Sequence, residues 1–366
     1  MASYILRRLI LMVFTIWGVL TVTFAIAQFV PGGPVERVIA QLQGQNLGAT
    51  SRISGGGGDI GSAAMSGSEG GSSYRGAQGL DPKFIKSLEK QFGLDKPWDE
   101  RYVKMLSDYA RFDFGKSYFR DIDVLSLIKE KLPVSISLGI WMTLLSYLIS
   151  IPLGIKKAVR DGTSFDSWTS MAIIIAYAVP GFMVAIFGLI LFAGGSFNMS
   201  FLPMRGLTSE NFAQLSLFGK ILDYFHHLIL PLFAMSLSAF ATLTLLTKNS
   251  FLDEIRKQYV LTARMKGLKE NQILYGHVFR NAMLIVIASF PSTFISAFFT
   301  GSLLIEMIFS LDGLGLLSYE SIVGRDYPVV FANLFIFSLL GLIANLVSDL
   351  AYTWIDPRID FESRKV

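Results

Sequence analysis

The chain of 366 residues contains no cysteine, and this absence removes several kinds of chemistry. Disulfides, thiolate metal sites and cysteine nucleophiles are excluded, although the compartment is left undecided. Histidine is almost as scarce, with three residues. His226 and His227 begin an apolar run without an acidic or thiol partner at metal-ligand spacing, so we expect a helix-start or interface role rather than metal binding.

Recognisable catalytic motifs are also missing. The sequence has no HExxH, GxSxG or complete Walker A motif. Residues 56–61 fit GxGxxG, but no strand precedes them and no helix follows. Gly115-Lys116-Ser117 resembles the end of a P-loop, but position 110 is Ala where the leading Gly should stand. We therefore expect the chain to be no enzyme and to bind no metal or cofactor itself.

Charged residues are few, at 16%, while 52% of the residues are hydrophobic and the mean hydropathy is +0.50. This composition is too apolar for a soluble domain and is typical of a polytopic membrane protein. The net charge of +4 is small, so a nucleic-acid partner is not indicated. The abundant Phe, 30 residues, suits surfaces that face lipid or pack helices together.

Apolar runs long enough to cross a hydrocarbon core about 30 Å thick recur along the chain. They occupy residues 9–30, 133–155, 168–193, 228–247, 282–309 and 331–355. We therefore predict an all-α membrane protein with about six transmembrane helices. The first run has an alternative reading, because Ala25-Ile26-Ala27 mimics a signal-peptidase site. Its length favours a retained membrane helix.

The remaining segments give the domain organisation. Residues 1–30 hold the N-terminal end and the first helix, 31–132 a long outer loop, and 133–366 a core of five further spans with the basic loop 248–281. The middle of the outer loop, residues 54–79, is rich in Gly and Ser and is typical of a flexible linker. After Asp81, apolar residues recur at helical spacing, which predicts ordered helices up to about residue 131.

Basic residues predict the orientation of the spans. The ends and loops assigned to the inside carry fifteen Lys and Arg, whereas the loops 194–227 and 310–330 carry three. Cytoplasmic loops are enriched in these residues, and long translocated loops such as 31–132 are largely exempt from the rule. We therefore expect both termini and the loops 156–166 and 248–281 to be cytoplasmic.

The loop 248–281 is the most informative stretch, with seven basic residues between two spans. Leu252, Ile255, Tyr259 and Ala263 recur at three or four residues, which predicts one amphipathic helix. Gly267 then ends that helix, as expected at a C-terminus. A second short helix is expected from Glu270, with apolar residues at Ile273, Leu274 and Val278.

The order of residues in this loop resembles the EAA loop of ABC importer permeases, in the Y-V-x-T-A-R-A-K-G form of the oligopeptide and dipeptide branch. The positions that carry the resemblance are Tyr259, Thr262, Ala263, Arg264, Lys266, Gly267, His277 and Asn281. The resemblance implies a coupling helix that docks into a groove of an ATPase. One departure is that Leu261 stands where the family has its glutamate, so a salt bridge by that residue is not implied here.

Further motifs extend the resemblance to most of the chain, apart from about residues 38–79. They are GSLLIE at 301–306, Leu314-Gly315, RDYP at 325–328, the pair Asn345 and Asp349, Tyr352, and DPR at 356–358. The long first loop and the final DPRIDFE are most similar to the Yej-type branch. Relatives there import oligopeptides, including peptide–nucleotide antibiotics such as microcin C.

The resemblance implies a type I ABC importer permease in the bacterial inner membrane, one half of a heterodimer with a sibling permease. It also implies two ATPase domains or subunits that bind ATP and Mg²⁺, a periplasmic peptide-binding protein, and a peptide as substrate. We also expect lipid around the spans and no nucleic-acid partner.

Polar and helix-breaking residues inside the spans are candidates for the pathway or for helix packing. These are Pro180, Gly181, Glu306, Asn345 and Asp349. For Pro180-Gly181 a packing kink is favoured over a pathway role, and for Asn345 and Asp349 helix–helix hydrogen bonding is favoured over a proton relay. A proton-coupled secondary transporter is the alternative function. It predicts carboxylates or histidines on several spans and inverted repeats, and the sequence has neither.

Overall fold

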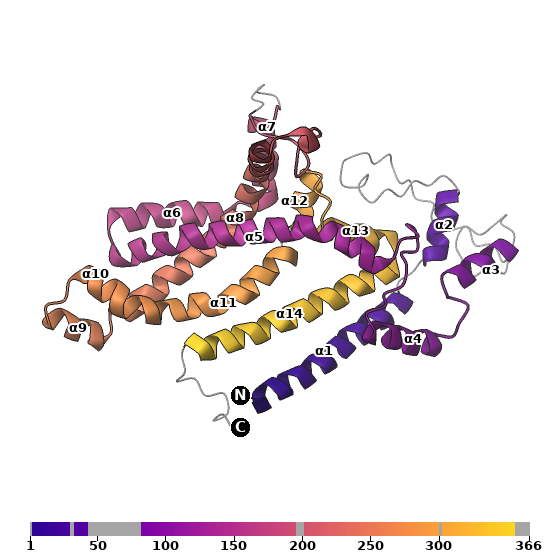
Figure 1. Cartoon of the computed structure of the whole chain (residues 1–366), viewed down its shortest axis with the longest axis horizontal. Coiled ribbons are helices and arrows are strands. Elements are labelled where there is room, and N and C mark those ends of the chain that lie inside the picture. Colours follow the sequence, from indigo (N-terminus) through magenta and orange to yellow (C-terminus); the bar gives the residue numbers. More distant parts are fainter. Residues whose placement is uncertain (1, 30–32, 43–81, 195–200, 300–301, 356–366) are drawn as a thin grey trace, which may run out of the picture. The chain divides into compact units, whose positions relative to one another are not determined.

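The computed structural model describes residues 2–29, 33–42, 82–194, 201–299 and 302–355 (Figure 1). These residues form helices joined by turns, with an isolated β-bridge between Lys116 and Asp123 and no strand within the described ranges. The chain divides into two compact units, residues 1–10, 131–316 and 339–366 in the first and 11–130 and 317–338 in the second. The expected linker 54–79 lies outside the described residues.

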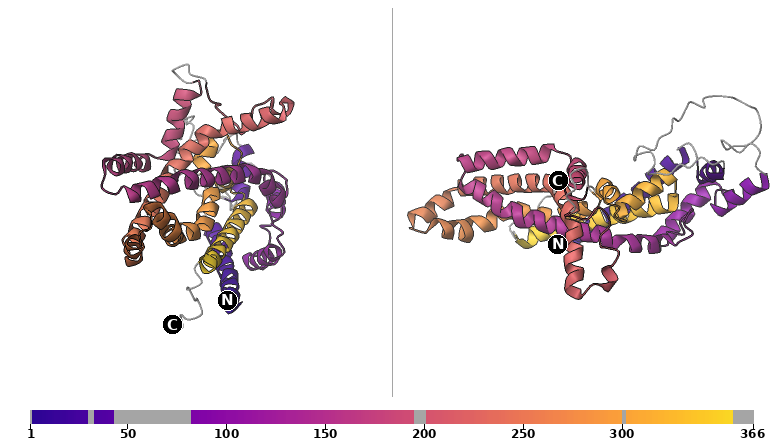
Figure 2. Two further views of the ribbon diagram at one scale, coloured as in Figure 1. Left: turned by 60° about the vertical axis from the view of Figure 1, so that its left-hand side comes forward. Right: turned by 90° about the horizontal axis from the view of Figure 1, so that it is seen from above.

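The first unit is built around α8 (Leu217–Ile255), a helix of 39 residues. It contacts α6 (Ser164–Ala178), α7 (Gly181–Phe192), α11 (Phe279–Phe299) and α12 (Ser302–Ile308) (Figures 1 and 2). The unit also holds most of α5 (Val124–Val159), the short α9 (Gln258–Met265) and α10 (Glu270–Ile273), a π-helical turn Leu274–Val278, and the 3-10 helix Phe212–Gln214. The start of α1 (Ala2–Phe29) and the end of α14 (Tyr327–Ile355) complete it.

Two apolar clusters form the core of this unit. One gathers residues of α5, α7, α8 and α12, with Leu138, Leu228 and Phe309 buried in it. The other joins residues of the coupling loop, the name used here for residues 248–281, to residues of α5 and α11, and Phe251, Val260 and Ile273 are buried in it. Burying apolar side chains stabilises the fold by about 25 cal/mol per Å² removed from solvent, so the second cluster fixes the loop to the unit.

Within the described ranges, five helices are long and apolar enough to cross a membrane, or six if α6 and α7 count as one broken span. This confirms the predicted all-α, multi-pass fold, but several boundaries differ. The expected span 228–247 is only the middle of α8, and the expected span 282–309 is divided between α11 and α12. The loop 310–330 contains a helix that the sequence pattern did not predict, α13 (Leu314–Gly324).

The break in the expected span 168–193 is larger than a packing kink. α6 and α7 meet at 93°. Val179 is extended, with φ −86° and ψ 120°, because the ring of a following proline disfavours the helical conformation. Pro180 then precedes the first turn of α7, where its missing N–H costs no helical hydrogen bond.

The second unit contains the rest of α1, the helices α2 (Pro34–Leu42), α3 (Pro82–Gln91) and α4 (Trp98–Ala110), and most of α13. The helical spacing after Asp81 is therefore confirmed. Its small core joins Val35 and Ile39 of α2 to Leu88 of α3 and Phe92. The Tyr118 ring lies 4.8 Å from that of Phe92 and extends the core.

The RDYP segment ties this unit together. Asp326 is buried and its carboxylate accepts two bonds, from the Ser117 hydroxyl at 2.5 Å and from the Tyr118 N–H at 3.0 Å. Buried carboxylates need such donors because an unpaired buried charge is costly. Ser117, which imitates a P-loop residue in the sequence, therefore has a structural partner.

Candidate coupling site

The turn of the coupling loop is a Schellman motif centred on Gly267. α9 ends at Met265, and Gly267 has φ +79°. The Leu268 N–H bonds the Ala263 carbonyl at 3.3 Å, and the Gly267 N–H bonds the Arg264 carbonyl at 2.9 Å. These two bonds satisfy carbonyls that the end of the helix leaves open. The predicted role of Gly267 as the residue after the helix end is confirmed.

The helix before this turn is shorter than predicted. α8 runs to Ile255, and α9 begins only at Gln258. Leu252 and Ile255 therefore belong to α8, and the single helix expected through Ala263 is wrong. Lys257 is extended, with ψ 154°, and forms the corner between the two helices.

A buried carboxylate joins the two sides of this corner. Glu254, on the last turn of α8, accepts a hydrogen bond from the Tyr259 hydroxyl at 2.9 Å. Asn281, at the start of α11, donates to the same hydroxyl at 3.4 Å. Lys257 forms an ion pair with Glu254. The structure thus brings together Tyr259 and Asn281, which are 22 residues apart, next to a glutamate that the motif did not indicate.

The second half of the loop begins with another charged pair. The Arg264 guanidinium donates two bonds to the Glu270 carboxylate, at 2.7 Å and 3.1 Å, and this pair raises the pKa of Arg264. The pair is exposed, so its contribution to stability is small, but its two-point geometry fixes α9 and α10 on either side of the turn. His277 lies exposed in the π-helical turn, a helix form that is frequent at functional sites.

α9 has one buried and one exposed apolar face. Val260 and Ala263 pack on the cluster around Phe251. On the other face Leu261 and Met265, four residues apart, are 52% and 81% exposed, and Leu268 is exposed after the turn. Thr262 and Lys266 are exposed beside them, the Thr262 hydroxyl bonding the Gln258 carbonyl. The sequence motif did not indicate Leu261 or Met265 as contact residues, because side-chain type alone does not predict exposure.

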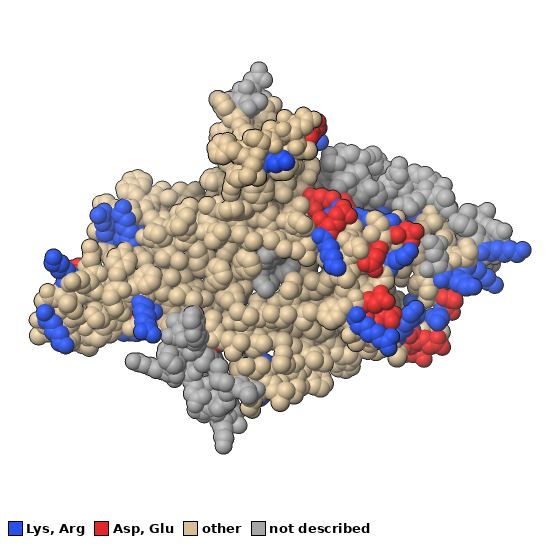
Figure 3. Space-filling model, viewed as in Figure 1, with Lys and Arg blue, Asp and Glu red and all other residues tan. Residues whose placement is uncertain are grey.

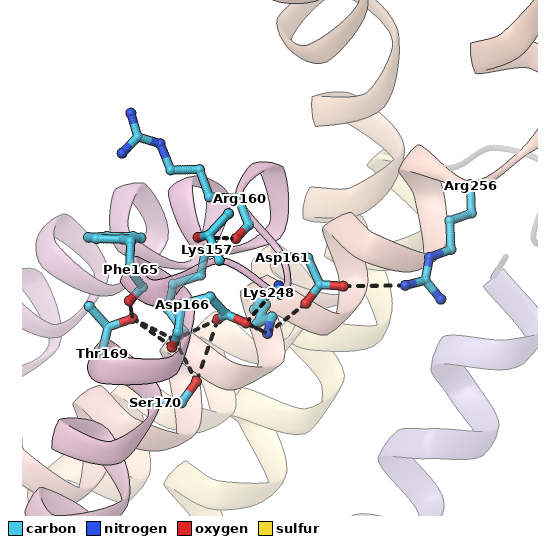
Figure 4. Close-up of polar contacts among 11 residues, drawn as sticks. Lys157, Arg160, Asp161, Phe165, Asp166, Thr169, Ser170, Lys248 and Arg256 are labelled. Atoms are coloured by element: carbon cyan, nitrogen blue, oxygen red, sulfur yellow. Dashed lines mark hydrogen bonds and ion pairs between the residues drawn. The ribbon is translucent and has the colours of Figure 1, made fainter.

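A second set of charges links the loop to the turn between α5 and α6 (Figure 4). Lys157 is 0% exposed, and its Nζ contacts Asp166 Oδ1 at 2.9 Å and the Thr169 and Ser170 hydroxyls at 2.8 Å. Lys248 of α8 bonds Asp166 Oδ2 at 2.7 Å. Of the cations assigned to the inner loops, Lys157 is therefore buried and Lys248 is half-buried.

In the segments 156–166 and 248–281 the remaining cations lie at the surface. In Figure 3 the charged side chains visible at the end of the first unit that carries α6, α9 and α10 are nearly all basic. Among the described residues no group of three or more His, Asp and Glu is placed to hold a metal ion. His227 does have an acidic neighbour that the sequence reading missed, Asp223 one turn earlier, at 3.6 Å.

The other candidate residues of the spans lie apart from this site. Pro180 and Gly181 begin α7, and Gly181 lies against the backbone of Ala234 on α8. Glu306 is buried and accepts the Leu316 N–H at 2.7 Å. Asp349 pairs with Arg8 at 2.6 Å and accepts the Tyr4 hydroxyl at 2.8 Å, which is a contact between helices α1 and α14. Asn345 is exposed on α14.

Comparisons with known proteins agree on one family. The model of the binding-protein-dependent transport system inner membrane component matches residues 150–361. The chain is 65% identical to the peptidoglycan transport system permease protein YejB of Agrobacterium fabrum and 56% identical to the inner membrane ABC transporter permease protein YejB of Escherichia coli O157:H7, over the whole length of each chain. It is 32% identical to the oligopeptide transport system permease protein AppB of Bacillus subtilis, covering 99% of this chain and all of AppB.

Among solved structures, a chain of the MetNI methionine ABC transporter in an inward-facing conformation is similar. The alignment covers 63% of this chain and 97% of that one, with 14% identity and a TM-score of 0.48.

Proposed function

We propose that this chain carries peptides and that its coupling loop is the surface that binds the importer's ATPase. The chain belongs to the binding-protein-dependent transport system inner membrane component family and is thus the permease subunit of an ATP-driven importer. Members of this family pair with ATPases and binding proteins. The chain itself would bind neither ATP nor Mg²⁺, which belong to the ATPase.

The observation that carries this proposal is the exposed apolar face of α9. Leu261, Met265 and Leu268 lie at a highly basic end of the unit and outside the span candidates. Exposed apolar side chains grouped in this way mark an interaction site, and a few well-packed residues at the centre of an interface carry most of its binding energy. The surrounding Arg264 and Lys266 would form its charged rim.

The mechanism follows from what the loop joins. α8 leads into α9, and α10 leads through the π-helical turn into α11, so a displaced loop pulls on two long helices. A partner can shift a conformational equilibrium only as far as its affinity differs between the two states. When the two ATPases close on ATP, they would favour one position of the loop. That position would in turn favour the conformation in which the pathway opens to one side of the membrane.

We further propose that the chain forms a heterodimer with a sibling permease and receives its cargo from a periplasmic binding protein. The names of the YejB and AppB relatives point to peptidoglycan-derived and oligopeptide cargo, and peptide–nucleotide antibiotics such as microcin C fit the same class. The proton-coupled alternative is less well supported, because Asp349 is bound to Arg8 and Tyr4 and Glu306 holds a backbone N–H.

The proposed orientation puts both termini and the coupling loop in the cytoplasm. Since the chain has no native cysteine, single-cysteine variants can be labelled with an impermeant maleimide. We expect Met204→Cys, in the loop after α7, to react from outside, and Lys266→Cys to react only after the membrane is opened. Labelling of Lys266→Cys in intact cells would reverse this orientation.

The function is tested by reconstituting the permease pair, the ATPase and the binding protein into vesicles and measuring ATP-dependent uptake of a labelled tripeptide. Met265→Asp places a charge in the proposed contact and should lower both ATPase co-purification and uptake. The matched control is Met204→Asp, also exposed but in the loop 201–211, which should leave both unchanged. Uptake that needs no ATP, or that responds equally to both substitutions, would contradict the proposal.

A further inference from the structure

The turn between α5 and α6 is joined to α8 by charges that are mostly out of solvent. Asp166, on the first turn of α6, is buried and receives Lys157 from α5 and Lys248 from α8 on its two carboxylate oxygens. The Gly162 N–H adds a third bond at 3.3 Å. Three segments of the chain therefore meet at one carboxylate (Figure 4).

Lys248 is the bridge in this arrangement. Its ammonium also contacts Asp161 Oδ1 at 3.0 Å, so it holds both ends of the α5–α6 turn. Arg256, at the end of α8, adds a contact to Asp161 Oδ2 at 3.4 Å on the exposed side. Lys157 of α5 is different, because its partners Asp166, Thr169 and Ser170 all lie on α6. It therefore holds α5 and α6 together but makes no link to α8.

Buried charged pairs resist separation. Removing one partner leaves a charge without compensation in a poorly solvated site, and this is strongly unfavourable even where the pair adds little net stability. An α8 that slid past the α5–α6 turn would have to separate Lys248 from Asp166 in that way. The arrangement favours movement of the turn together with the coupling loop.

We propose that Lys248 is a positioning residue for coupling, which makes the α5–α6 hairpin move with α8 and α9 as one body. ATPase-driven displacement then reaches α5 and α6 as well as the two helices that the loop joins directly. The inference rests on the proposed function. It adds a second connection, through α5 and α6, by which movement of the ATPase reaches the membrane-spanning helices.

Lys248→Met is the sharpest variant, because it cuts the bridge and leaves the Lys157–Asp166 pair in place. Lys248→Arg keeps a cation that can reach two carboxylates and should restore coupling. The control Lys156→Met removes a neighbouring cation of α5 that lies over the Phe165 ring and has no contact with Asp161 or Asp166 in the described structure. Asp161→Asn removes only the more exposed arm and should have an intermediate effect.

Two measurements on the complete importer test the proposal. The first is the number of peptides taken up per ATP hydrolysed, which we expect Lys248→Met to lower about fivefold or more, the lower end of usual coupling factors. The second is the distance between spin labels at Ser164→Cys and Gln258→Cys, both exposed in a chain without native cysteine. In the otherwise unchanged chain, the distance between the labels should differ by less than about 2 Å between the nucleotide-free and ATP-bound states, as for helices that move together. In Lys248→Met it should become dependent on the nucleotide.

The proposal is overturned if the label distance changes with nucleotide in the unchanged chain, or if Lys248→Met couples as well as Lys156→Met. It is also overturned if Lys248→Arg fails to restore coupling while its label distance matches that of the unchanged chain. A failure of the proposed function looks different. The unchanged complex would then show no ATP-driven peptide uptake, whatever the label distances are.

Discussion

The Tyr259 hydroxyl donates to Glu254 Oε1 at 2.9 Å, across the corner where α8 gives way to α9. The two residues stand on opposite sides of the extended Lys257, so this bond fixes the angle at which α9 leaves α8. Glu254 is therefore the carboxylate that organises the loop, in a sequence whose motif has Leu261 in place of the family's glutamate.

Tyr259→Phe should loosen the corner without altering its apolar packing. A hydrogen bond to a charged group contributes about 1.5–3 kcal/mol, and the lost bond leaves Glu254 less well satisfied. We expect faster amide hydrogen exchange in α9 and weaker ATPase association. Tyr275→Phe, on an exposed tyrosine of the same loop, is the control and should change neither.

The same bond predicts a pH dependence. Burial raises the pKa of Tyr259 to about 12, and the Glu254 carboxylate adds to the rise. The folded chain thus keeps the proton at a pH where the unfolded chain, with a tyrosine pKa of 10.0, loses it. The protection from hydrogen exchange that this bond gives the α9 amides should be complete below pH 10 and should fall as the pH rises toward 12. Tyr259→Phe should lack that part of the profile.

Gly267→Val should distort the Schellman turn. A residue with a Cβ pays roughly 1–2 kcal/mol in the left-handed region, and a β-branched residue pays more. We expect normal membrane levels, weakened ATPase co-purification and little uptake. Gly267→Ala should be milder, and Gly267→Asn milder than Val because Asn tolerates this region. Gly276→Ala, at a glycine of the same loop without positive φ, is the control. Full activity of Gly267→Val would remove the turn from the coupling role.

Gly313→Ala should disturb the packing around Glu306 in the first unit. A Cβ at this position would lie 2.5 Å from the Glu306 carboxyl carbon, so the carboxylate has to move and its bond to the Leu316 N–H is strained. Overpacking of this kind costs about 1–3 kcal/mol. Thermal unfolding of the purified complex should shift to a lower temperature, whereas Gly341→Ala, in a helix with open space around the added Cβ, should not lower it. Equal transitions for the two variants would contradict the packing described.

Asp326→Asn should release the segment around Ser117 and Tyr118. The amide can accept one of the two bonds but lacks the charge that strengthens both, a loss of about 1.5–3 kcal/mol. Hydrogen exchange at the Tyr118 amide should become faster, while Asp95→Asn, an exposed acid of the same unit, should have no effect. Unchanged protection in Asp326→Asn would argue that the aromatic core holds this segment without the carboxylate.

Local sequence signals were enough for part of this structure. Gly267 followed by an apolar residue and preceded by a basic one predicts a helix end, and the turn forms from those residues alone. The apolar length of the spans likewise predicts helices, because every backbone group in a membrane must be bonded internally.

Other features depend on contacts between distant residues. Lys157 and Lys248 count as inner-loop cations in the sequence, and only the folded chain brings both to Asp166. The exposure of Met265 is set by which face of α9 packs on Phe251. The dipeptide Pro180-Gly181 predicts a break but not its size, and in the structure α6 and α7 meet at 93° with α7 packed against α8.

The central claim is that the face of α9 bearing Met265 contacts the ATPase, and site-directed cross-linking tests it most directly. Met265→Cys supplies the only cysteine of this chain, and a short cysteine-reactive photo-cross-linker attached there is activated in the complete, transporting importer. The account predicts a covalent product between this chain and the ATPase, and none from Met204→Cys. A transporting complex in which Met265→Cys cross-links only to lipid or to the other membrane subunit would contradict it.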